Sequence, residues 1–269
     1  MVFYCLELSL AYVRKHIHIS GDNMKLSILQ KRMIMIGIFL CFSIGLYAIM
    51  GKLEEKKQEY DLLQTNALPT TNKVIIIDAG HGLPDEGAIG FSGTTEQAIN
   101  LSIALKLQKL IEQSGAKVLL TRSDENGIYS LDSKSIRNKK ISDIKNRVEI
   151  GNTSDADLFI SIHLNKYPPS EAYRGWQTFY QKTNENSKTL ANMIQQSLNN
   201  NIEFKNDRTP LPISGVYIMD KVKIPSIVIE CGFLSNPEEV KLLKTDTYQN
   251  KLAWGIFTGL QEYFTKQAT

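Results

Sequence analysis

Three side chains capable of acid–base or metal chemistry stand at the ends of three apolar segments. His81 follows VIIIDAG, His163 lies in DLFISIHLN, and Glu230 lies in SIVIECGF. His81 and His163 are also the only histidines after position 18. If these segments are parallel strands, their carboxyl ends meet at one edge of a sheet, where open α/β sheets place their sites. The pattern therefore predicts one shared site at that edge.

Two imidazoles at one edge indicate a metal site, and imidazole nitrogen suits zinc. Catalytic zinc takes three protein ligands and a water molecule. No third histidine is available in the main body, so the third ligand would be a carboxylate. The first loop and the helix after it offer Asp78, Asp85, Glu86 and Glu96. Glu96 opens a predicted helix after a glycine-rich loop and can face the same edge, but the residues alone leave this choice open.

Glu230 is a carboxylate in an apolar strand, directly after Ile-Val-Ile. Burial of this kind raises the pKa of a carboxyl group towards the range that a general base needs. The next residue, Cys231, is a weaker candidate for a nucleophile, because its neighbours are apolar and no further histidine is available as its base.

Each of these residues has a plainer interpretation when it is taken alone. His81 could belong to a phosphate-binding turn, and His163 could be a hydrogen-bonded core histidine. Glu230 could form a structural ion pair with Arg147 or Arg174. Their common position at three strand ends favours one catalytic metal site over three unrelated roles.

The main body alternates strands with helices. Strands are predicted at residues 73–78, 117–121, 157–165, 175–181, 215–219 and 226–233. Helices are predicted from Thr94 to Gly115, at residues 143–154, 187–200 and 236–244, and from Thr247 to Lys266. Thr94 and Gln97 fit a capping box at the start of the first helix. This order predicts a single α/β domain with a central, twisted, mostly parallel sheet flanked by helices.

An N-terminal segment precedes this domain. Residues 33–50 form a run of 18 residues without a charge, about the minimum for a membrane-spanning helix. Lys31 and Arg32 precede the run and favour an N-terminus in the cytoplasm. The expected organisation is an anchor region over residues 1–51, a charged linker over 52–72 and a catalytic domain over 73–266. A cleaved signal peptide is the alternative, although no good cleavage site follows the run.

Charge and cysteine content exclude some classes of protein. Residues 1–51 contain five of the 31 Lys and Arg and two of the 28 acidic residues, so 26 of each sign remain and the rest of the chain is neutral. This balance argues against a nucleic-acid partner, which needs a clustered basic face. Only one of the three cysteines, Cys231, lies in the main body, so no disulfide can form within it.

Four motifs in order resemble the zinc-dependent N-acetylmuramoyl-L-alanine amidases of bacterial cell walls, the amidase-3 type. These motifs are IIIDAGHG followed by GAIG, TTEQAINL, ADLFISIHLN and SIVIECGFLSN. The resemblance covers residues 73–266. The short anchor and bare catalytic domain resemble most the germination-specific cortex amidases of spore-forming bacteria. In one departure, Leu83 stands where the family often has a second glycine after Gly-His-Gly.

The resemblance implies a function and a site. It implies that zinc is held by His81, Glu96 and His163, and that Glu230 is the catalytic acid–base. It further implies cleavage of the amide between N-acetylmuramic acid and L-alanine in peptidoglycan, during muramic-δ-lactam formation and germination. The expected substrate is a glycan strand with stem peptides, reached from a membrane anchor with the catalytic domain outside the cytoplasm, or secreted after cleavage. A zinc peptidase acting on stem peptides and a non-catalytic wall-binding protein remain alternatives, and an accessory protein is possible.

Overall fold

The computed structural model describes residues 27–65 and 68–268. The chain divides into two units, one up to Asn66 and the other from Ala67 onward. The predicted cytoplasmic residues before position 27 lie outside the described ranges. The two units are described separately below, and the second contains every residue of the predicted site.

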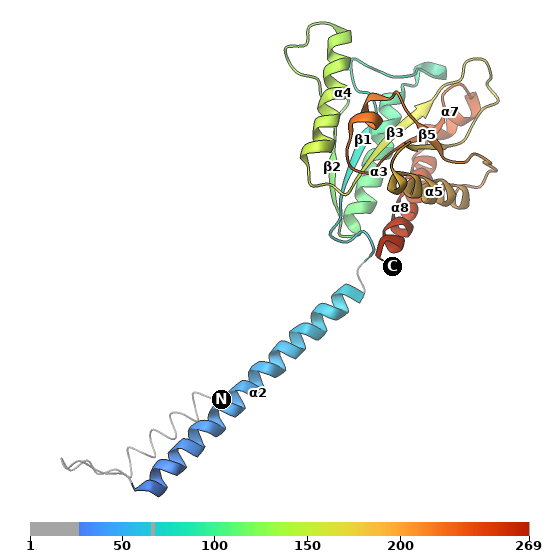
Figure 1. The fold of residues 1–269 in the computed structure, drawn as a ribbon. Helices are drawn as coiled ribbons and strands as arrows, with labels where there is room; N and C mark the ends of the chain where they lie inside the picture. The colour runs from blue at the N-terminus through green and yellow to red at the C-terminus, as the bar shows by residue number, and fades with distance from the viewer. Residues whose placement is uncertain (1–26, 66–67, 269) are drawn as a thin grey trace. The chain divides into compact units, whose positions relative to one another are not determined.

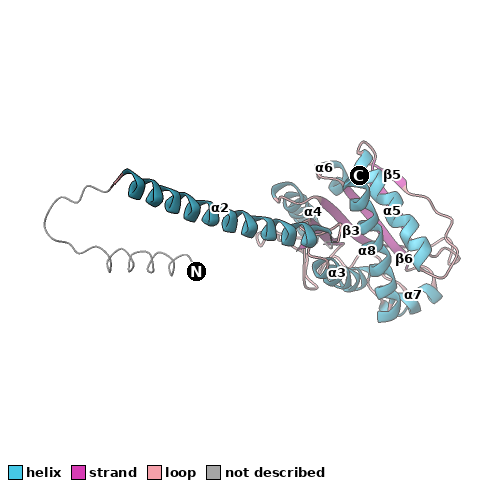
Figure 2. Ribbon diagram, turned by 90° about the horizontal axis from the view of Figure 1, so that it is seen from below, coloured by secondary structure: helices cyan, strands magenta, loops and turns pink. Residues whose placement is uncertain are grey.

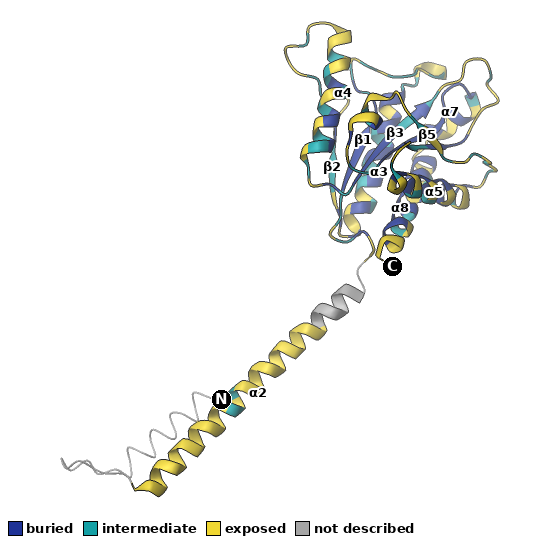
Figure 3. Ribbon diagram, viewed as in Figure 1, coloured by how far each residue is buried: buried dark blue, intermediate teal, exposed yellow. Residues whose placement is uncertain are grey.

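The described part of the first unit is one helix, α2 (Ile28–Thr65), which contains the predicted apolar run. Residues 28–58 are long and apolar enough to cross a membrane by length and composition, and none of the most apolar window is buried (Figure 3). A signal sequence would pass the same test. The helix continues through residues 52–65, where a linker was expected, because that stretch lacks proline and is rich in Leu, Glu, Lys and Gln, which are strong helix formers.

The second unit is built on a six-stranded sheet with the order β2-β1-β3-β6-β4-β5 (Figure 1). Its strands are β1 (Val74–Ala79), β2 (Lys117–Leu120), β3 (Leu158–Asn165), β4 (Gln177–Gln181), β5 (Leu211–Ile213) and β6 (Ser226–Phe233). Strands β2, β1, β3 and β6 are parallel, whereas β4 is antiparallel to β6 and parallel to β5. The predicted mostly parallel sheet is therefore confirmed.

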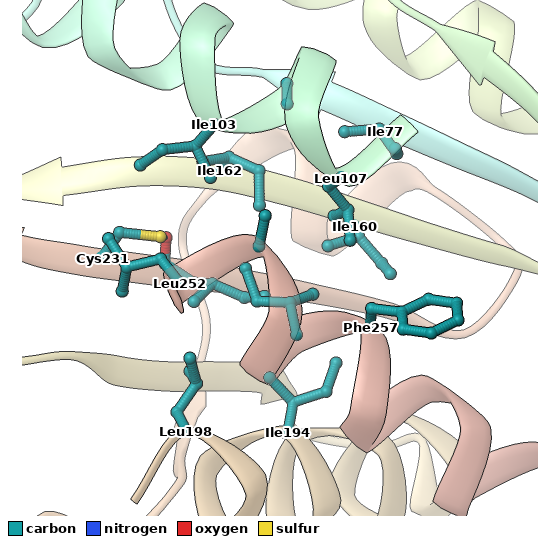
Figure 4. Packing of buried hydrophobic residues seen from close by; sticks show 14 of the residues in the cluster. Ile77, Ile103, Leu107, Ile160, Ile162, Ile194, Leu198, Cys231, Leu252 and Phe257 are labelled. Carbon is teal, nitrogen blue, oxygen red and sulfur yellow. The ribbon is translucent and has the colours of Figure 1, made fainter. Parts of the chain in front are cut away.

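Helices cover both faces of this sheet (Figure 2). They are α3 (Glu96–Gln113), α4 (Ile136–Thr153), α5 (Glu185–Asn201), α6 (Tyr217–Lys221), α7 (Pro237–Leu243) and α8 (Asp246–Ala268), and the short 3₁₀ helix η1 (Phe91–Gly93) precedes α3. Side chains of the β1 run alternate between the two faces: Ile75 and Ile77 join the larger core, and Ile76 joins Val148 of α4 on the other face. Figure 4 shows Ile77 in the larger core together with Ile103 and Leu107 of α3. A strand covered on both faces must be apolar throughout, which explains the β-branched run.

Two local predictions were wrong. Residues 215–219 were expected to form a strand, but helix α6 begins at Tyr217, and short apolar runs do not separate the two states by pattern. The capping box also does not form, because the N-cap of α3 is Thr95, without a side-chain cap. Thr94 instead donates to the Phe91 carbonyl at 3.0 Å.

Two further elements differ in extent. Helix α4 begins at Ile136 rather than at residue 143, with the Ser135 hydroxyl accepting the Asn138 N–H. The short strand β5 was not predicted, because its three residues include a proline and show no alternation that a pattern could detect.

A buried ion-pair network fixes the end of β1. Arg147 Nη1 of α4 donates to Asp78 Oδ1 at 2.5 Å, and Arg147 Nε donates to Asp143 Oδ2 at 2.6 Å. Thr121 and Ser161 donate their hydroxyls to the two oxygens of Asp78 at 2.7 and 2.5 Å. Burial raises the pKa of Asp78, but the Arg147 charge and these hydrogen bonds outweigh it and hold the pKa below its ordinary value. The network joins β1, β2, β3 and α4 beneath the site.

We expect Arg147→Met to lower the free energy of unfolding by about 3–5 kcal/mol, since it leaves buried Asp78 without its cation. Chemical unfolding followed by tryptophan fluorescence checks this, because both tryptophans, Trp176 and Trp254, lie in the second unit. Arg137→Met, on the exposed side of the same helix, is the matched control and should change stability by no more than about 0.5 kcal/mol. Equal effects of the two substitutions would contradict a structural role for the network.

Candidate metal centre

His81, Glu96 and His163 come together at the carboxyl edge of the sheet. One ligand atom from each lies within 4.8 Å of the other two. Glu96 Oε1 is 3.2 Å from His81 Nε2 and 3.0 Å from His163 Nδ1. Among the described side chains, those of residues 27–58 and 68–268, no second cluster of His, Cys, Asp or Glu meets this distance. Two imidazoles and one carboxylate are the donor set of a His₂Glu zinc site.

Glu96 is the first residue of α3, and backbone N–H groups of two other segments hold its side chain beside the histidines. Its Oε2 accepts the Ala88 N–H at 2.8 Å, and its Oε1 accepts the Leu164 N–H at 3.1 Å. A helix N-terminus favours a negative charge of this kind. Glu96 is only 4% exposed, so water screens the interaction of its charge with the two imidazoles only weakly.

The other three carboxylates considered from the sequence have different places. Asp85 Oδ2 lies 2.9 Å from His81 Nδ1, on the side of the ring away from Glu96, and 3.1 Å from Lys140 Nζ. Metal-binding histidines usually give their second nitrogen to a carboxylate in this way. Glu86 is exposed, and Asp78 is buried in the network below the site.

The site carries coupled charges. Burial lowers the pKa of His81, but the hydrogen bonds and charges of Asp85 and Glu96 outweigh it and raise the pKa to about 9. Burial raises the pKa of Glu96, but His163 and His81 together hold it far below its ordinary value. Hydrogen bonds and charge from His81 also hold the pKa of Asp85 low, against its burial. The two carboxylates therefore stay ionised and favour a cation between them.

The backbone of the Gly-His-Gly turn is shaped by close approach. His81 itself has a φ of 62°, in the left-handed region that few residues other than glycine adopt. Gly80 packs directly against the His163 ring, so that a Cβ at this position would overlap the imidazole. Gly80 therefore makes room for the second histidine, His163.

Two buried arginines hold this turn by its carbonyl groups. Arg147 Nη2 donates to the His81 carbonyl at 2.6 Å. Arg122 donates to the carbonyls of Ala79, Gly80 and Gln97 at 2.8, 3.0 and 2.8 Å. Sequence reasoning did not find Arg122, although its place directly after the strand LLT is the same signal that identified His81.

Glu230 lies next to the cluster on the neighbouring strand. It pairs with His163 in the register of β3 and β6. Its Oε2 is buried and has no hydrogen-bond partner among the described residues. Burial raises the pKa of Glu230 to about 7, with the Glu96 charge adding to the rise and the histidines opposing it. The suggested ion pair is wrong, since Arg147 binds Asp78 and Arg174 stacks on Phe204 instead.

Cys231 has no part in this edge. It is completely buried and lies in the hydrophobic core beside Leu252 (Figure 4). Burial raises the pKa of its thiol far above the ordinary value. A thiol that stays protonated is a poor nucleophile, which agrees with the sequence analysis.

A mainly apolar recess opens beside the two histidines. It has a volume of about 160 Å³ and lies between the turn after β1 and helices α4 and α6. Ile144, Val216, Tyr217 and Ile218 form its apolar wall, and Lys140 stands beside Asp85 at its rim. The predicted site is therefore accessible from this side to a small apolar group of a substrate.

The second unit matches a known family and known relatives. The model of the Amidase_3 family, N-acetylmuramoyl-L-alanine amidase, matches residues 75–262. The chain is 34% identical over 229 residues to the germination-specific N-acetylmuramoyl-L-alanine amidase of Bacillus subtilis, covering 85% of this chain and 95% of that protein.

Solved structures show the same fold. The structure of the CwlD amidase from Clostridioides difficile in complex with the GerS lipoprotein is 46% identical, with a TM-score of 0.70, and the match covers 72% of this chain and 100% of that one. An N-acetylmuramoyl-L-alanine amidase from Clostridium difficile 630 is 30% identical, with a TM-score of 0.64, and covers 73% of this chain and 99% of that one.

We expect Gly80→Ala to weaken zinc binding by about 10–100-fold, the range typical of substitutions that disturb the orientation of a metal ligand. The added methyl group would push the His163 ring out of place. Titration of the metal-free, detergent-solubilised chain against a chromophoric chelator measures the affinity. Gly37→Ala in α2, where a Cβ meets nothing, is the control and should bind as the wild type does. An unchanged affinity in Gly80→Ala would place the metal elsewhere.

Zinc affinity should also depend on pH because of His81. Its pKa of about 9 means that below this pH a proton must leave before the nitrogen can bind a cation. The apparent dissociation constant of the zinc complex should therefore fall by up to about tenfold for each unit by which the pH rises from 6 to 9. The affinity should reach a plateau once the pH exceeds the pKa of His81. In Asp85→Asn, loss of the carboxylate lowers that pKa, so this plateau should begin at a lower pH. A flat profile in the wild type would contradict this ligand assignment.

Proposed function

The chain belongs to the N-acetylmuramoyl-L-alanine amidase family, and on this premise we propose that it is a zinc amidase whose ligands are His81, Glu96 and His163 and whose acid–base is Glu230. The bond cleaved is the amide between the lactyl group of N-acetylmuramic acid and L-alanine in peptidoglycan. The observation that supports this proposal most is the convergence of two imidazoles and a buried carboxylate beside an unpaired glutamate.

The residues present fit the zinc ion that the family implies. Glu96 Oε1 is close to both imidazoles, and Asp85 fixes the ring of His81 from behind. When bound there, zinc would polarise the substrate carbonyl and lower the pKa of a coordinated water towards about 7. The ionised carboxylates of Glu96 and Asp85 would offset the charge of the cation.

Glu230 is placed to move the proton. Its raised pKa is near neutrality, which suits a group that must both accept and donate. As a base, Glu230 takes a proton from the attacking water. As an acid, it gives that proton to the nitrogen of L-alanine when the amide bond breaks. The products are a glycan strand with a free lactyl carboxyl group and a stem peptide with a free amino terminus.

The apolar recess supports an amide flanked by small apolar groups. Both the lactyl group and L-alanine carry a methyl group next to the scissile bond, and the wall of Ile144, Val216 and Ile218 offers such groups an apolar contact. Arg122 and Arg147 would hold the turn of His81 in position during the reaction, because they bind its carbonyl groups.

The cellular setting is also a proposal. The name of the germination-specific relative supports a role in germination. We further propose a role in spore cortex maturation, with muramic-δ-lactam formation. Helix α2 and the preceding Lys31 and Arg32 support a membrane anchor with the catalytic unit outside the cytoplasm. The similar CwlD amidase was solved with a lipoprotein, and we propose that a lipoprotein partner assists this chain as well.

Product analysis tests the function. We expect the purified chain with zinc to release stem peptides from purified spore cortex peptidoglycan and to leave free lactyl carboxyl groups on the glycan. A chelator should abolish this cleavage. Mass spectrometry of the products separates this outcome from that of a peptidase, which leaves L-alanine on the glycan. Glu230→Gln should keep its zinc and its fold but lose about 10²–10⁴-fold in kcat. Full activity of that variant would remove Glu230 from the mechanism, and absence of any cleavage by the wild type would favour a wall-binding protein.

A further inference from the structure

A second group of charged side chains lies further along the same edge of the sheet. Strand β4 is antiparallel to β6, and its first residue, Gln177, pairs with Glu230. Strand β5 runs parallel to β4, so it also starts at this edge, and the segment that precedes it lies there as well. Gln177 Nε2 donates to the Thr209 carbonyl at 2.5 Å and joins the two segments. Arg174 and Arg208, each three residues before a strand, therefore follow Glu230 along the edge.

Aromatic rings hold both guanidinium groups in place. Arg174 Cζ lies 4.4 Å from the centre of the Phe204 ring, and Arg208 Cζ lies 5.0 Å from that of Phe233. Phe204 in turn packs on the buried ring of Trp176, with ring centres 5.1 Å apart. Arg208 Nη1 also donates to the Arg174 carbonyl at 2.6 Å. A stacked guanidinium keeps its remaining N–H groups free to bind a carboxylate through its edge.

The two arginines have no acidic partner of their own. Neither forms an ion pair with a carboxylate of the described residues, whereas nearby Asp207 is paired with Lys205 at 3.1 Å. Glu239, the buried carboxylate of α7, uses its two oxygens on the N–H groups of Gly175 and Phe233, each at 2.7 Å. The guanidinium groups therefore remain available to an anion from outside the chain.

A cleft of about 370 Å³ opens at these arginines. We call it the basic cleft, because three of its lining residues are basic and its one acidic residue is the Asp207 already paired with Lys205. It is lined by Ala172, Tyr173, Arg174, Phe204, Lys205, Asn206, Asp207 and Arg208. Its volume suits part of a peptide rather than a single ion. Because β6 lies between β3 and β4 in the sheet, the basic cleft is on the far side of Glu230 from the two histidines.

We propose that the basic cleft binds a carboxylate of the stem peptide through Arg174 and Arg208, an inference that rests on the proposed amidase function. Glu230 donates its proton to the departing amine, so the peptide half of the substrate leaves on the side of Glu230. The free carboxylate nearest to the scissile bond belongs to the D-glutamate that follows L-alanine. The basic cleft thus makes the enzyme selective for an acidic stem peptide.

The competing explanation is structural. The positive charges of Arg174 and Arg208 lower the pKa of Glu239, although burial raises it more, to about 7. If the arginines serve only to support this buried carboxylate, their loss would affect all substrates alike. A pair of substrates that differ only in one carboxylate separates the two roles.

The experiment compares two muramoyl dipeptides that end in D-glutamate with its γ-carboxyl group blocked as a methylamide. One keeps the free α-carboxylate, and the other carries the neutral α-carboxamide in its place. The zinc-loaded, detergent-solubilised full chain should have a kcat/KM at least about tenfold higher for the acidic substrate, the size of one charge-assisted hydrogen bond. Arg208→Gln should remove most of this preference by raising KM for the acidic substrate, with less than about twofold change for the neutral one. Arg174→Gln, at an exposed position, should act in the same direction.

Lys109→Gln is the matched control, since Lys109 is exposed and lies about 20 Å along α3 from Glu96. This variant should keep the wild-type preference. Equal activity of the wild type on both substrates, or equal losses on both in Arg208→Gln, would overturn the inference while leaving the amidase function standing. Cleavage of neither substrate by the wild type would overturn the proposed function and this inference with it.

Discussion

The structure of the site depends on one buried carboxylate, Asp78, at the point where β1 ends. Its two oxygens receive Arg147, Thr121 and Ser161, so β1 is tied to its two neighbouring strands and to α4 at once. Arg147 then uses a second nitrogen on the carbonyl of His81. A buried charge without its partner strongly lowers the free energy of unfolding, so each member of this network depends on the others. The position of the first histidine is thereby set by the buried residues Asp78 and Arg147.

The site above this network places three carboxyl groups in different surroundings. Glu96 and Asp85 each contact an imidazole and stay ionised, whereas Glu230 has a buried oxygen without a partner and a pKa near neutrality. The first two are suited to hold a cation and to fix a ring. The third is suited to carry a proton. A difference in hydrogen bonding, rather than in residue type, separates the proposed metal ligand from the proposed acid–base.

Most of the fold and the ends of β1, β3 and β6 could be predicted from the sequence. Buried parallel strands are continuous β-branched runs, and in this chain the polar residues of the proposed site follow directly after such runs. The choice of Glu96 needed the family resemblance, since the capping pattern placed the N-cap of α3 at Thr94, one residue before the observed Thr95. The contacts of Asp85 with His81, of Gly80 with His163 and of Arg122 with three carbonyls depend on how segments far apart in the chain meet. Hydrophobic periodicity carries no information on such contacts.

The reversal of strand direction between β6 and β4 explains why charge gathers along one edge. If β4 ran parallel to β6, its preceding segment would lie at the opposite edge, and Arg174 would be remote from Glu230. With β4 reversed, the chain enters this strand at the catalytic edge and brings Gly175 close enough to donate to Glu239. Glu239 also accepts the N–H of Phe233, three residues after Glu230, so one buried carboxylate holds both the end of the catalytic strand and the entrance of β4. Glu239 therefore fixes both segments at the same edge, which places the basic cleft on the β4 side of Glu230, away from the two histidines.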